Sequence, residues 1–392
     1  MTHTILVTDG EQRSALATVR SLGRAGYRVH VAATRDRSLA ASSRHCAGSH
    51  RVPDPLSDAG AFAAALMAIA RDMGADVLLP ISEASLLAVL PVRHEFRAAI
   101  PFVSADRFRA VCDKERVLAA AVRHGIRVPA QLSIGPRVEV PEHRWQFPVV
   151  LKPSRSVVGS GAARAKTSVT YAHDASELAS RLQAIPDDAY PVLLQERIEG
   201  PGVAISVLLW EGELKAAFAH RRIREKPPSG GVSVLRTSVP LDHDLLTRSV
   251  ELLREFEWQG VAMVEFKIDR DGIPFLMEIN GRLWGSLQLA IDAGVDFPAM
   301  LVRLALGSEV EPRLSYSSDV RTRWEWGDVD HLVSRLRRSS RALSLPVGSP
   351  GRWRSLLDFL GTFASAARSE VFNWVDPRPF FRETVQWLKL GS

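Results

Sequence analysis

The chain has 392 residues, more than one hydrophobic core usually fills, which predicts roughly two to three domains. Its 46% hydrophobic and 24% charged residues are typical of a globular protein and exclude a disordered chain. The two cysteines, Cys46 and Cys112, exclude a disulfide framework and have no zinc-site spacing. No signal peptide and no run of about 18 apolar residues is present, so we expect a cytoplasmic protein without a transmembrane segment.

The positive charge is concentrated near the end of the sequence. Lysine and arginine outnumber aspartate and glutamate by 50 to 44, a net charge of +6. Residues 331–392 contain ten basic and four acidic residues, which is +6 by itself, and three tryptophans. One interpretation is a weak contact of this basic tail with an anionic surface or a partner protein, with nucleic acid not expected. The other is a solvated helical face with buried tryptophans, the commoner role of a charge run.

The first 105 residues alternate strand and helix patterns. Short apolar runs predict strands, and segments with helical periodicity lie between them. The strands are expected at residues 4–8, 28–33, 76–80 and 100–103, and the helices at 11–25 and 60–73. This order predicts an open parallel sheet of α/β class. The first turn, Thr8-Asp9-Gly10, lacks the glycine spacing of a dinucleotide site, so no nicotinamide cofactor is expected.

The following 200 residues mix helix and antiparallel strand patterns. We expect helices at 106–125 and 174–184, strands at 147–152 and 191–197, and a hairpin of 204–210 with 214–220. The last segment, 311–392, is rich in tryptophan and arginine, and its Pro/Gly/Ser cluster at 346–351 predicts a bend.

The segment VAMVEFKIDRDGIPFLMEIN contains the most informative pattern, two alternating apolar runs around Asp271-Gly272. This dipeptide favours a two-residue type I′ turn, and the turn then determines the register of the two strands. In that register Phe266 faces Met277 on the apolar side of the hairpin, and Glu265 faces Glu278 on the other side. Two carboxylates are therefore predicted directly opposite each other.

Like charges across a strand pair are destabilising unless a cation lies between them. Period-two alternation places Asn280 and Lys267 on the same face as the two glutamates. Carboxylates with an amide oxygen suit Mg²⁺, which keeps several waters and accepts phosphate ligands. One interpretation is thus a metal site of Glu265, Glu278 and Asn280. The register alone equally allows a solvated face with lysine and arginine partners.

Two lysines are candidates for phosphate contact. Lys152 ends the apolar strand FPVVLK and precedes the loop SRSVVGSG, whose glycines can turn backbone N–H groups toward an anion. Lys114 stands at a helix start in the sequence CDKE. Taken alone, each lysine is more often a solvated side chain. The Walker pattern does not occur, which excludes a P-loop.

The run AHRRIREKPPSGG includes Arg222 and Arg224, whose guanidinium groups suit a carboxylate or phosphate. By itself such a run is more often the solvated edge of a sheet. The sequence has no G-x-S-x-G, no H-E-x-x-H and no catalytic cysteine context, so it predicts no nucleophilic hydrolase or zinc protease.

Taken in order, these segments resemble the ATP-grasp superfamily, specifically its carbamoyl-phosphate-synthase-like, carboxylate–amine ligase branch. The resemblance covers about residues 1–306 and rests on Lys114 before HGIRVP, FPVVLKP with its loop, LQERIEG, VEFKID and MEINGRLWGS. It implies a Rossmann-like parallel-sheet domain over 1–110, a two-lobed α+β ATP-grasp domain over 111–310, and a helical basic extension over 311–392. The middle domain would divide into a lid subdomain at about 113–198 and a metal-binding subdomain at about 199–310.

The resemblance also implies roles for individual residues. The phosphates of ATP would be contacted by two lysines and a flexible loop, namely Lys114, Lys152, Ser154, Gly159, Ser160 and Gly161. The adenine ring would be read, largely by backbone groups, at a hinge of Glu196, Arg197 and Ile198. Mg²⁺ or Mn²⁺ would be bound by Glu265, Glu278 and Asn280, with Glu278 bridging two ions.

Catalytic roles at the acyl-phosphate are implied for Arg282 and Lys152, and Arg222 and Arg224 are candidates for holding an anionic substrate. Many relatives carry an acidic residue for the ribose after the hinge, where this chain has Gly200-Pro201-Gly202-Val203. The implied function is an ATP- and Mg²⁺-dependent ligase that activates a carboxylate as an acyl-phosphate and joins it to an amine. The alternatives are a nucleotide-binding protein docked through its basic tail, and an ATP-grasp enzyme whose acceptor is bicarbonate or a thiol.

Overall fold

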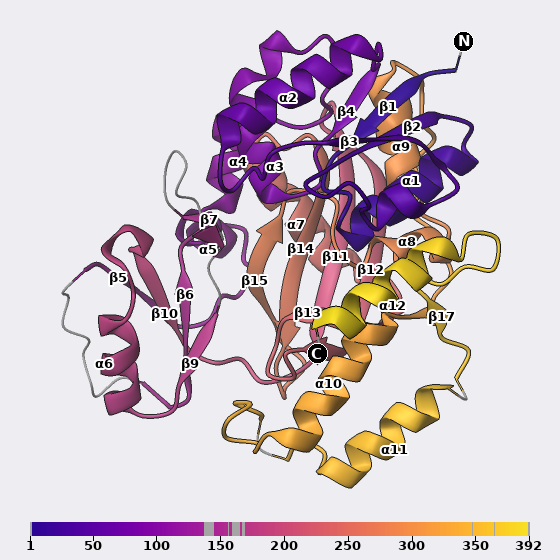
Figure 1. The fold of residues 1–392 in the computed structure, drawn as a ribbon. Coiled ribbons are helices and arrows are strands. Elements are labelled where there is room, and N and C mark those ends of the chain that lie inside the picture. The colour runs from indigo at the N-terminus through magenta and orange to yellow at the C-terminus, as the bar shows by residue number, and fades with distance from the viewer. Residues whose placement is uncertain are drawn as a thin grey trace.

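The computed structural model describes residues 2–136, 145–155, 157–158, 165–166, 169–346, 348–363 and 365–390. Figure 1 shows an N-terminal sheet with its helices at the top, a small sheet at the left and a large sheet in the centre. The last three helices lie along the lower right side of the large sheet. None of the described helices is long and apolar enough to cross a bilayer.

The N-terminal part is the parallel sheet that the sequence predicts, with the strand order β3-β2-β1-β4. Its strands are β1 (Thr4–Val7), β2 (Arg28–Ala33), β3 (Cys46–Arg51) and β4 (Val77–Leu79). Its helical segments are α1 (Arg13–Arg24), η1 (Ala40–Ser42), α2 (Ala59–Asp72), α3 (Glu83–Val89) and η2 (Leu90–Glu95). β3 was not expected, because CAGSHR lacks an apolar run.

The strand expected at residues 100–103 is absent. Val77 makes only an isolated bridge with Ala99. Pro101 has no N–H for a ladder, and the chain turns there with Phe102 N donating to Ile100 O at 2.8 Å.

The small sheet is antiparallel, in the order β5-β10-β6-β9, and has a hydrophobic cluster of its own. Its strands are β5 (Gln131–Ile134), β6 (Val149–Pro153), β9 (Thr170–Ala172) and β10 (Val192–Gln195). A further pair is formed by β7 (Val157–Val158) and β8 (Ala165–Lys166). The accompanying helical segments are α6 (Ala175–Gln183) and η4 (Asp187–Ala189).

The single helix expected at 106–125 is two helices, α4 (Ala105–Cys112) and α5 (Lys114–Arg123). Asp113 separates them because its backbone is extended, with ψ at 104°. Its side chain then caps α5 by accepting a hydrogen bond from Arg116 N at 3.2 Å. The break places Lys114 at the first position of the second helix, as the sequence predicts.

The large sheet has seven strands in the order β15-β14-β11-β12-β13-β16-β17. They are β11 (Gly202–Trp210), β12 (Glu213–Lys226), β13 (Val232–Ser238), β14 (Gly260–Ile268), β15 (Pro274–Asn280), β16 (Arg321–Arg323) and β17 (Arg368–Ser369). Its helices are α7 (His243–Glu255), α8 (Leu287–Ala293) and α9 (Phe297–Ala305).

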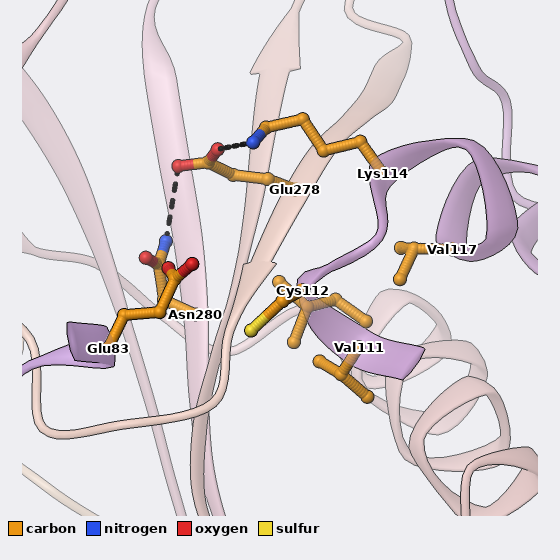
Figure 2. Close-up of a pocket in the computed structure, with 8 residues that line it drawn as sticks. Glu83, Val111, Cys112, Lys114, Val117, Glu278 and Asn280 are labelled. Carbon is orange, nitrogen blue, oxygen red and sulfur yellow. Dashed lines mark hydrogen bonds and ion pairs between the residues drawn. The ribbon is translucent and has the colours of Figure 1, made fainter. Parts of the chain in front are cut away.

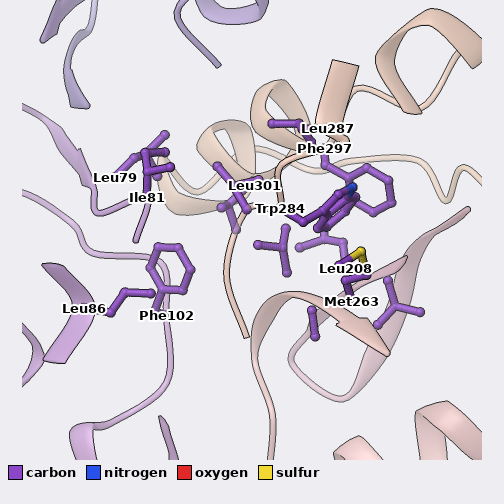
Figure 3. Packing of buried hydrophobic residues seen from close by; sticks show 14 of the residues in the cluster. Leu79, Ile81, Leu86, Phe102, Leu208, Met263, Trp284, Leu287, Phe297 and Leu301 are labelled. Carbon is purple, nitrogen blue, oxygen red and sulfur yellow. The ribbon is translucent and has the colours of Figure 1, made fainter. Parts of the chain in front are cut away.

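One continuous core joins the N-terminal sheet to the large sheet. Figure 3 shows Leu79 and Phe102 of the N-terminal part on one side, with Trp284, Phe297 and Leu301 on the other. Trp284 is fully buried and meets the Phe297 ring edge-on, with centroids 5.0 Å apart. The two sheets therefore share one hydrophobic interior.

Three C-terminal helices, α10 (Glu325–Arg337), α11 (Arg352–Phe363) and α12 (Arg378–Leu390), complete the fold. Buried ion pairs connect this region to the rest of the chain. Glu370 pairs with both Arg13 of α1 and Arg236 of β13. Asp376 accepts from Arg20 Nε at 2.8 Å. Removing one partner of such a pair leaves an uncompensated buried charge, which costs about 3 to 5 kcal/mol.

Glu383 of α12 is expected to make the stability of the fold depend on pH. Burial raises its pKa to about 7, against the effect of Arg13, and its buried Oε2 has no hydrogen-bond partner among the residues that the structure describes. An unfolded glutamate has a pKa of about 4.3. Between these values the native state holds a proton that the unfolded state has released. The contribution of Glu383 to the free energy of unfolding therefore falls as pH rises from about 4 to 7, by roughly 3 kcal/mol.

Glu383→Gln should remove this slope, because glutamine does not titrate and still accepts the bond from Trp324 Nε1. The measurement is urea unfolding of both proteins across that pH range. Glu251→Gln, at an exposed position of α7, is the control and should keep the wild-type slope. Parallel pH profiles for wild type and Glu383→Gln would contradict the prediction.

Candidate functional site

The turn of the carboxylate hairpin differs from the predicted two-residue turn. Asp269 N donates to Ile273 O at 3.0 Å, so three residues form the loop. Gly272 supplies its positive φ of 81°. A three-residue loop shifts the pairing next to the turn by one residue relative to the expectation.

A bulge restores the predicted register where the carboxylates lie. Phe266 pairs with Leu276 instead of Met277, and the register shifts again before Glu265, which pairs with Glu278 as predicted. Leu276 is therefore fully buried, while Met277, expected on the apolar face, is only half-buried. The opposed pair of glutamates is confirmed, although the turn type from which the pair was predicted is wrong.

The two glutamates share one amide and two cations. Asn280 Nδ2 donates to Glu265 Oε1 at 3.0 Å and to Glu278 Oε1 at 3.3 Å. Arg222 pairs with Glu265, and Lys114 Nζ lies 3.9 Å from Glu278 Oε2. These positive groups reduce the repulsion between the two carboxylates.

The two carboxyl groups respond differently to this environment. Burial raises the pKa of Glu265, although Arg222 opposes the rise. Burial also acts to raise the pKa of Glu278, but the ammonium groups of Lys114 and Lys152 outweigh it and lower the pKa. Glu278 is thus the more strongly ionised of the two, and it faces both candidate phosphate lysines.

Lys152 reaches the same place from β6. Its Nζ lies 3.9 Å from Met277 Sδ, the residue before Glu278. Burial lowers the pKa of Lys152 to about 8, against the raising effect of Glu278. The structure therefore brings together both lysines, both glutamates and the asparagine that the sequence singled out.

Arg282 holds the asparagine from the other side. Its Nη2 donates to Asn280 Oδ1 at 2.9 Å, and its Nη1 donates to the carbonyl of Leu283 at 3.2 Å. Because Asn280 Oδ1 accepts this bond, Nδ2 of Asn280 is directed toward the two glutamates and the amide oxygen toward Arg282. Arg282 thus contacts Asn280, and its role at an acyl-phosphate stays a prediction.

A pocket opens beside these groups, lined by Glu83, Val111, Cys112, Lys114, Val117, Glu278, Ile279 and Asn280. Figure 2 shows Glu83 of α3 and Lys114 of α5 approaching it from the helices, while Glu278 and Asn280 approach it from β15. Sequence reasoning missed Glu83. The only local signal was a helix start after Ser82, whose side chain accepts from Ser85 N. Burial and Glu83 together raise the pKa of Cys112 well above its usual value, so its thiol stays neutral.

The two candidate substrate arginines, Arg222 and Arg224, have different partners in the structure. β12 lies inside the sheet, so the basic run is not a solvated edge. Arg222 Nη1 donates to Glu225 Oε1 at 3.0 Å and stays beside Glu265. Arg224 follows a register shift and forms two bonds of 2.6 Å with the buried Asp328 of α10. A substrate role for either arginine stays a prediction.

The candidate hinge follows β10. Glu196 N donates to Ala130 O at 2.8 Å, and Ile198 is buried. The Arg197 guanidinium lies over the Tyr171 ring, 5.1 Å from its centroid, and donates to Ser344 O at 2.6 Å. The hinge therefore contacts both the small sheet and the segment after α10.

The glycine at position 200, after the hinge, has a steric cause. A Cβ on Gly200 would lie 1.7 Å from the carbonyl oxygen of Ile268, and its φ is 155°. Only glycine allows this approach to β14. The neighbouring Glu199 pairs with Arg270, with Oε2 and Nη2 2.5 Å apart.

The loop after β6 is described only in part. Ser154 is buried, and its carbonyl accepts a bond from Lys114 N at 3.0 Å, which joins the two lysine-bearing segments. Gly159, Ser160 and Gly161 lie outside the described residues.

A family model described as "ATP-grasp in the biosynthetic pathway with Ter operon" matches residues 188–327. A comparison with curated proteins gives no match. Among solved structures, L-amino acid ligase from Bacillus licheniformis has a TM-score of 0.62 and 15% identity, covering 79% of this chain and 75% of that one.

Two further solved structures contain nucleotide. One is the biotin carboxylase domain of Hydrogenobacter thermophilus 2-oxoglutarate carboxylase with MgADP, ADP and bicarbonate. Its TM-score is 0.63 at 16% identity, covering 82% of this chain and 73% of that one. The other is N5-carboxyaminoimidazole synthetase from Staphylococcus aureus with ADP, with a TM-score of 0.62, 14% identity and 82% of both chains covered.

At these identities the structures establish the fold, and the family model matches the region from the end of the small sheet through the carboxylate hairpin. The predicted fold class is confirmed: a parallel N-terminal sheet, antiparallel sheets and C-terminal helices. The chain therefore has the ATP-grasp fold, and its residues 188–327 match a family model of ATP-grasp proteins.

Proposed function

We propose that the protein is an ATP- and Mg²⁺-dependent ligase that activates a substrate carboxylate as an acyl-phosphate and joins it to an amine. The observation that carries the proposal is the opposed pair Glu265 and Glu278, bridged by Asn280, with Lys114 and Lys152 beside it. Two anions and two phosphate-binding cations on adjacent elements suit a metal-bound triphosphate better than a structural ion pair. The solved ligase and the ADP-bound structures of the same fold support it.

The donor set fits Mg²⁺ or Mn²⁺. Glu265 and Glu278 offer carboxylate oxygens, the preference of hard cations. Asn280 would add its Oδ1 once its amide turns away from Arg282, because Nδ2 faces the glutamates in this structure. Within the described residues, no three His, Cys, Asp or Glu side chains come together as a metal site. The other ligands of an ion would therefore be phosphate oxygens and water. When bound, the ion neutralises the charge that develops on the transferred phosphoryl group.

The chain's own groups supply the remaining requirements of the reaction. Lys114 and Lys152 would hold the triphosphate in line with the substrate, and Arg282 would stabilise charge on the transferred group. A carboxylate oxygen of the substrate attacks the γ-phosphorus, and the bond to ADP breaks. The amine nitrogen then attacks the acyl carbon, releases inorganic phosphate and loses a proton. Adenine recognition is proposed for the hinge of Glu196, Arg197 and Ile198.

The nucleotide site is tested by thermal unfolding with and without MgATP. At about 100 times its Kd, the ligand should stabilise the wild type by about 2.7 kcal/mol, a shift of a few degrees in Tm. Glu278→Gln should lose this shift, because the amide cannot supply the anionic ligand. Glu251→Gln, on the exposed side of α7, should keep it. An equal shift in Glu278→Gln and wild type would contradict the site.

The chemistry is tested by measuring ADP release with panels of carboxylates and amines. ADP release that needs both substrates is the expected result, and Glu278→Gln should abolish it. Repeating the panel with bicarbonate or a thiol in place of the amine identifies the acceptor. Turnover only with one of these acceptors would overturn the amine part of the proposal, and MgATP binding without turnover would indicate a nucleotide-binding protein.

Lys152 should take up a proton when MgATP binds near pH 8. With a pKa of about 8, the buried amine is close to half neutral at that pH. Phosphate oxygens favour the charged form and raise the pKa, so binding draws in up to about half a proton. Near pH 6 the amine is already charged, and no uptake is expected.

Calorimetric titration in buffers of different ionisation enthalpy measures this uptake directly. Lys152→Met should remove it, whereas Lys215→Met, which alters a lysine paired with Glu213 at the far end of β12, should not. Identical proton uptake in the Lys152→Met variant would assign the titration to another group.

A further inference from the structure

Exposed apolar side chains gather in the C-terminal region. Among the described residues, fifteen large hydrophobic side chains are exposed, and ten of them follow residue 331. This region is less than a fifth of the chain, so its share is far above an even distribution. Such a concentration on a folded surface indicates an interaction site rather than scattered exposure.

On α11 these residues form one stripe. Trp353, Leu357 and Leu360 are 80%, 64% and 53% exposed and recur at the spacing of one helical face. The opposite face is held by β12, because Arg224 donates to Thr362 Oγ1 at 2.7 Å and to Asp358 O at 3.3 Å. The stripe is therefore directed away from the protein.

Arginines precede and flank the stripe in the sequence. Residues 331–357 contain six arginines, and the acidic residue that follows, Asp358, is paired with Arg354. Five of the arginines are exposed, namely Arg337, Arg338, Arg341, Arg352 and Arg354, and Arg341 is paired with Asp174. The sixth, Arg335, donates to Pro350 O and to Ser355 Oγ, which brings the end of α10 beside the start of α11. Figure 1 shows these two helix ends at the lower edge of the molecule.

We propose that this basic apolar surface, the five exposed arginines with Trp353, Leu357 and Leu360, docks the protein on an anionic lipid surface. A 12-residue helix with an apolar stripe, flanking arginines and an exposed tryptophan has the pattern of an interfacial helix that lies in a bilayer surface. The arginines would contact lipid phosphates while the stripe enters the acyl boundary. This inference does not depend on the ligase chemistry.

The charge pattern disfavours the other occupants. A second copy of the same surface would place five arginines against five arginines, which repel. The phosphates of a nucleic acid would pair with the arginines, but a nucleic acid has no apolar phase that could bury two leucines of a helix. An anionic bilayer offers phosphates that pair with the arginines and an apolar interior that buries the stripe.

The test is co-sedimentation of the full chain, without nucleotide, with vesicles of phosphatidylcholine alone or with about 30% phosphatidylserine. We expect binding only to the anionic vesicles. Trp353→Ser with Leu357→Ser, and separately Arg337→Glu with Arg338→Glu, should each weaken binding by about tenfold or more. The exposure of all four side chains means that the variants should fold.

The controls change exposed apolar residues and exposed arginines elsewhere on the surface. Val122→Ser with Leu314→Ser, and Arg51→Glu with Arg71→Glu, should bind as the wild type does. Absence of binding to anionic vesicles at low salt would overturn the proposal. Binding that survives the Trp353 and Leu357 changes would also overturn it, because a purely electrostatic contact does not need the stripe. Binding to poly-glutamate beads but not to vesicles would assign the surface to an acidic protein instead.

Discussion

The repulsion between Glu265 and Glu278 is the constraint on which the site depends. Two carboxylates on neighbouring strands cannot both stay charged without positive groups close by. The fold places three groups beside the carboxylates: Arg222 from the same sheet, Lys114 from a helix start, and the Asn280 amide, which donates to both glutamates. Each of these groups comes from a different element, so the repulsion makes the site sensitive to how the helix α5 and the large sheet are assembled.

The hairpin shows how much a sequence pattern can predict and where it stops. Alternation placed Glu265 and Glu278 on the same face of the hairpin, and the register of the assumed turn made them partners. The turn type was wrong, because Asp269 closes a longer loop, and the bulge at Met277 was not visible in the pattern. The two deviations cancel at the carboxylates. The predicted pairing of the carboxylates was therefore correct. Only the residues between the carboxylates and the turn pair with partners other than those predicted.

Other parts of the site depend on contacts that are distant in sequence, which no local pattern encodes. Glu83 enters the pocket from the N-terminal part, almost 200 residues before Glu278. Arg224 looked equivalent to Arg222, yet a register shift and the buried Asp328 direct it to α10. The glycine at position 200 looked like a lost ribose contact, and only the approach of Ile268 explains it. Strands and helix starts were predictable because their signals are local.

The ion pair between Arg20 and Asp376 also bears on how the chain is synthesised. Its partners are separated by 356 residues. At about 5 to 20 residues per second, a ribosome would need roughly 20 to 70 s to make the carboxylate after the guanidinium. Until then α1 carries an arginine whose buried partner does not yet exist. The N-terminal sheet can form early from its own apolar strands, but this helix reaches its final electrostatic environment only after Asp376 has been made.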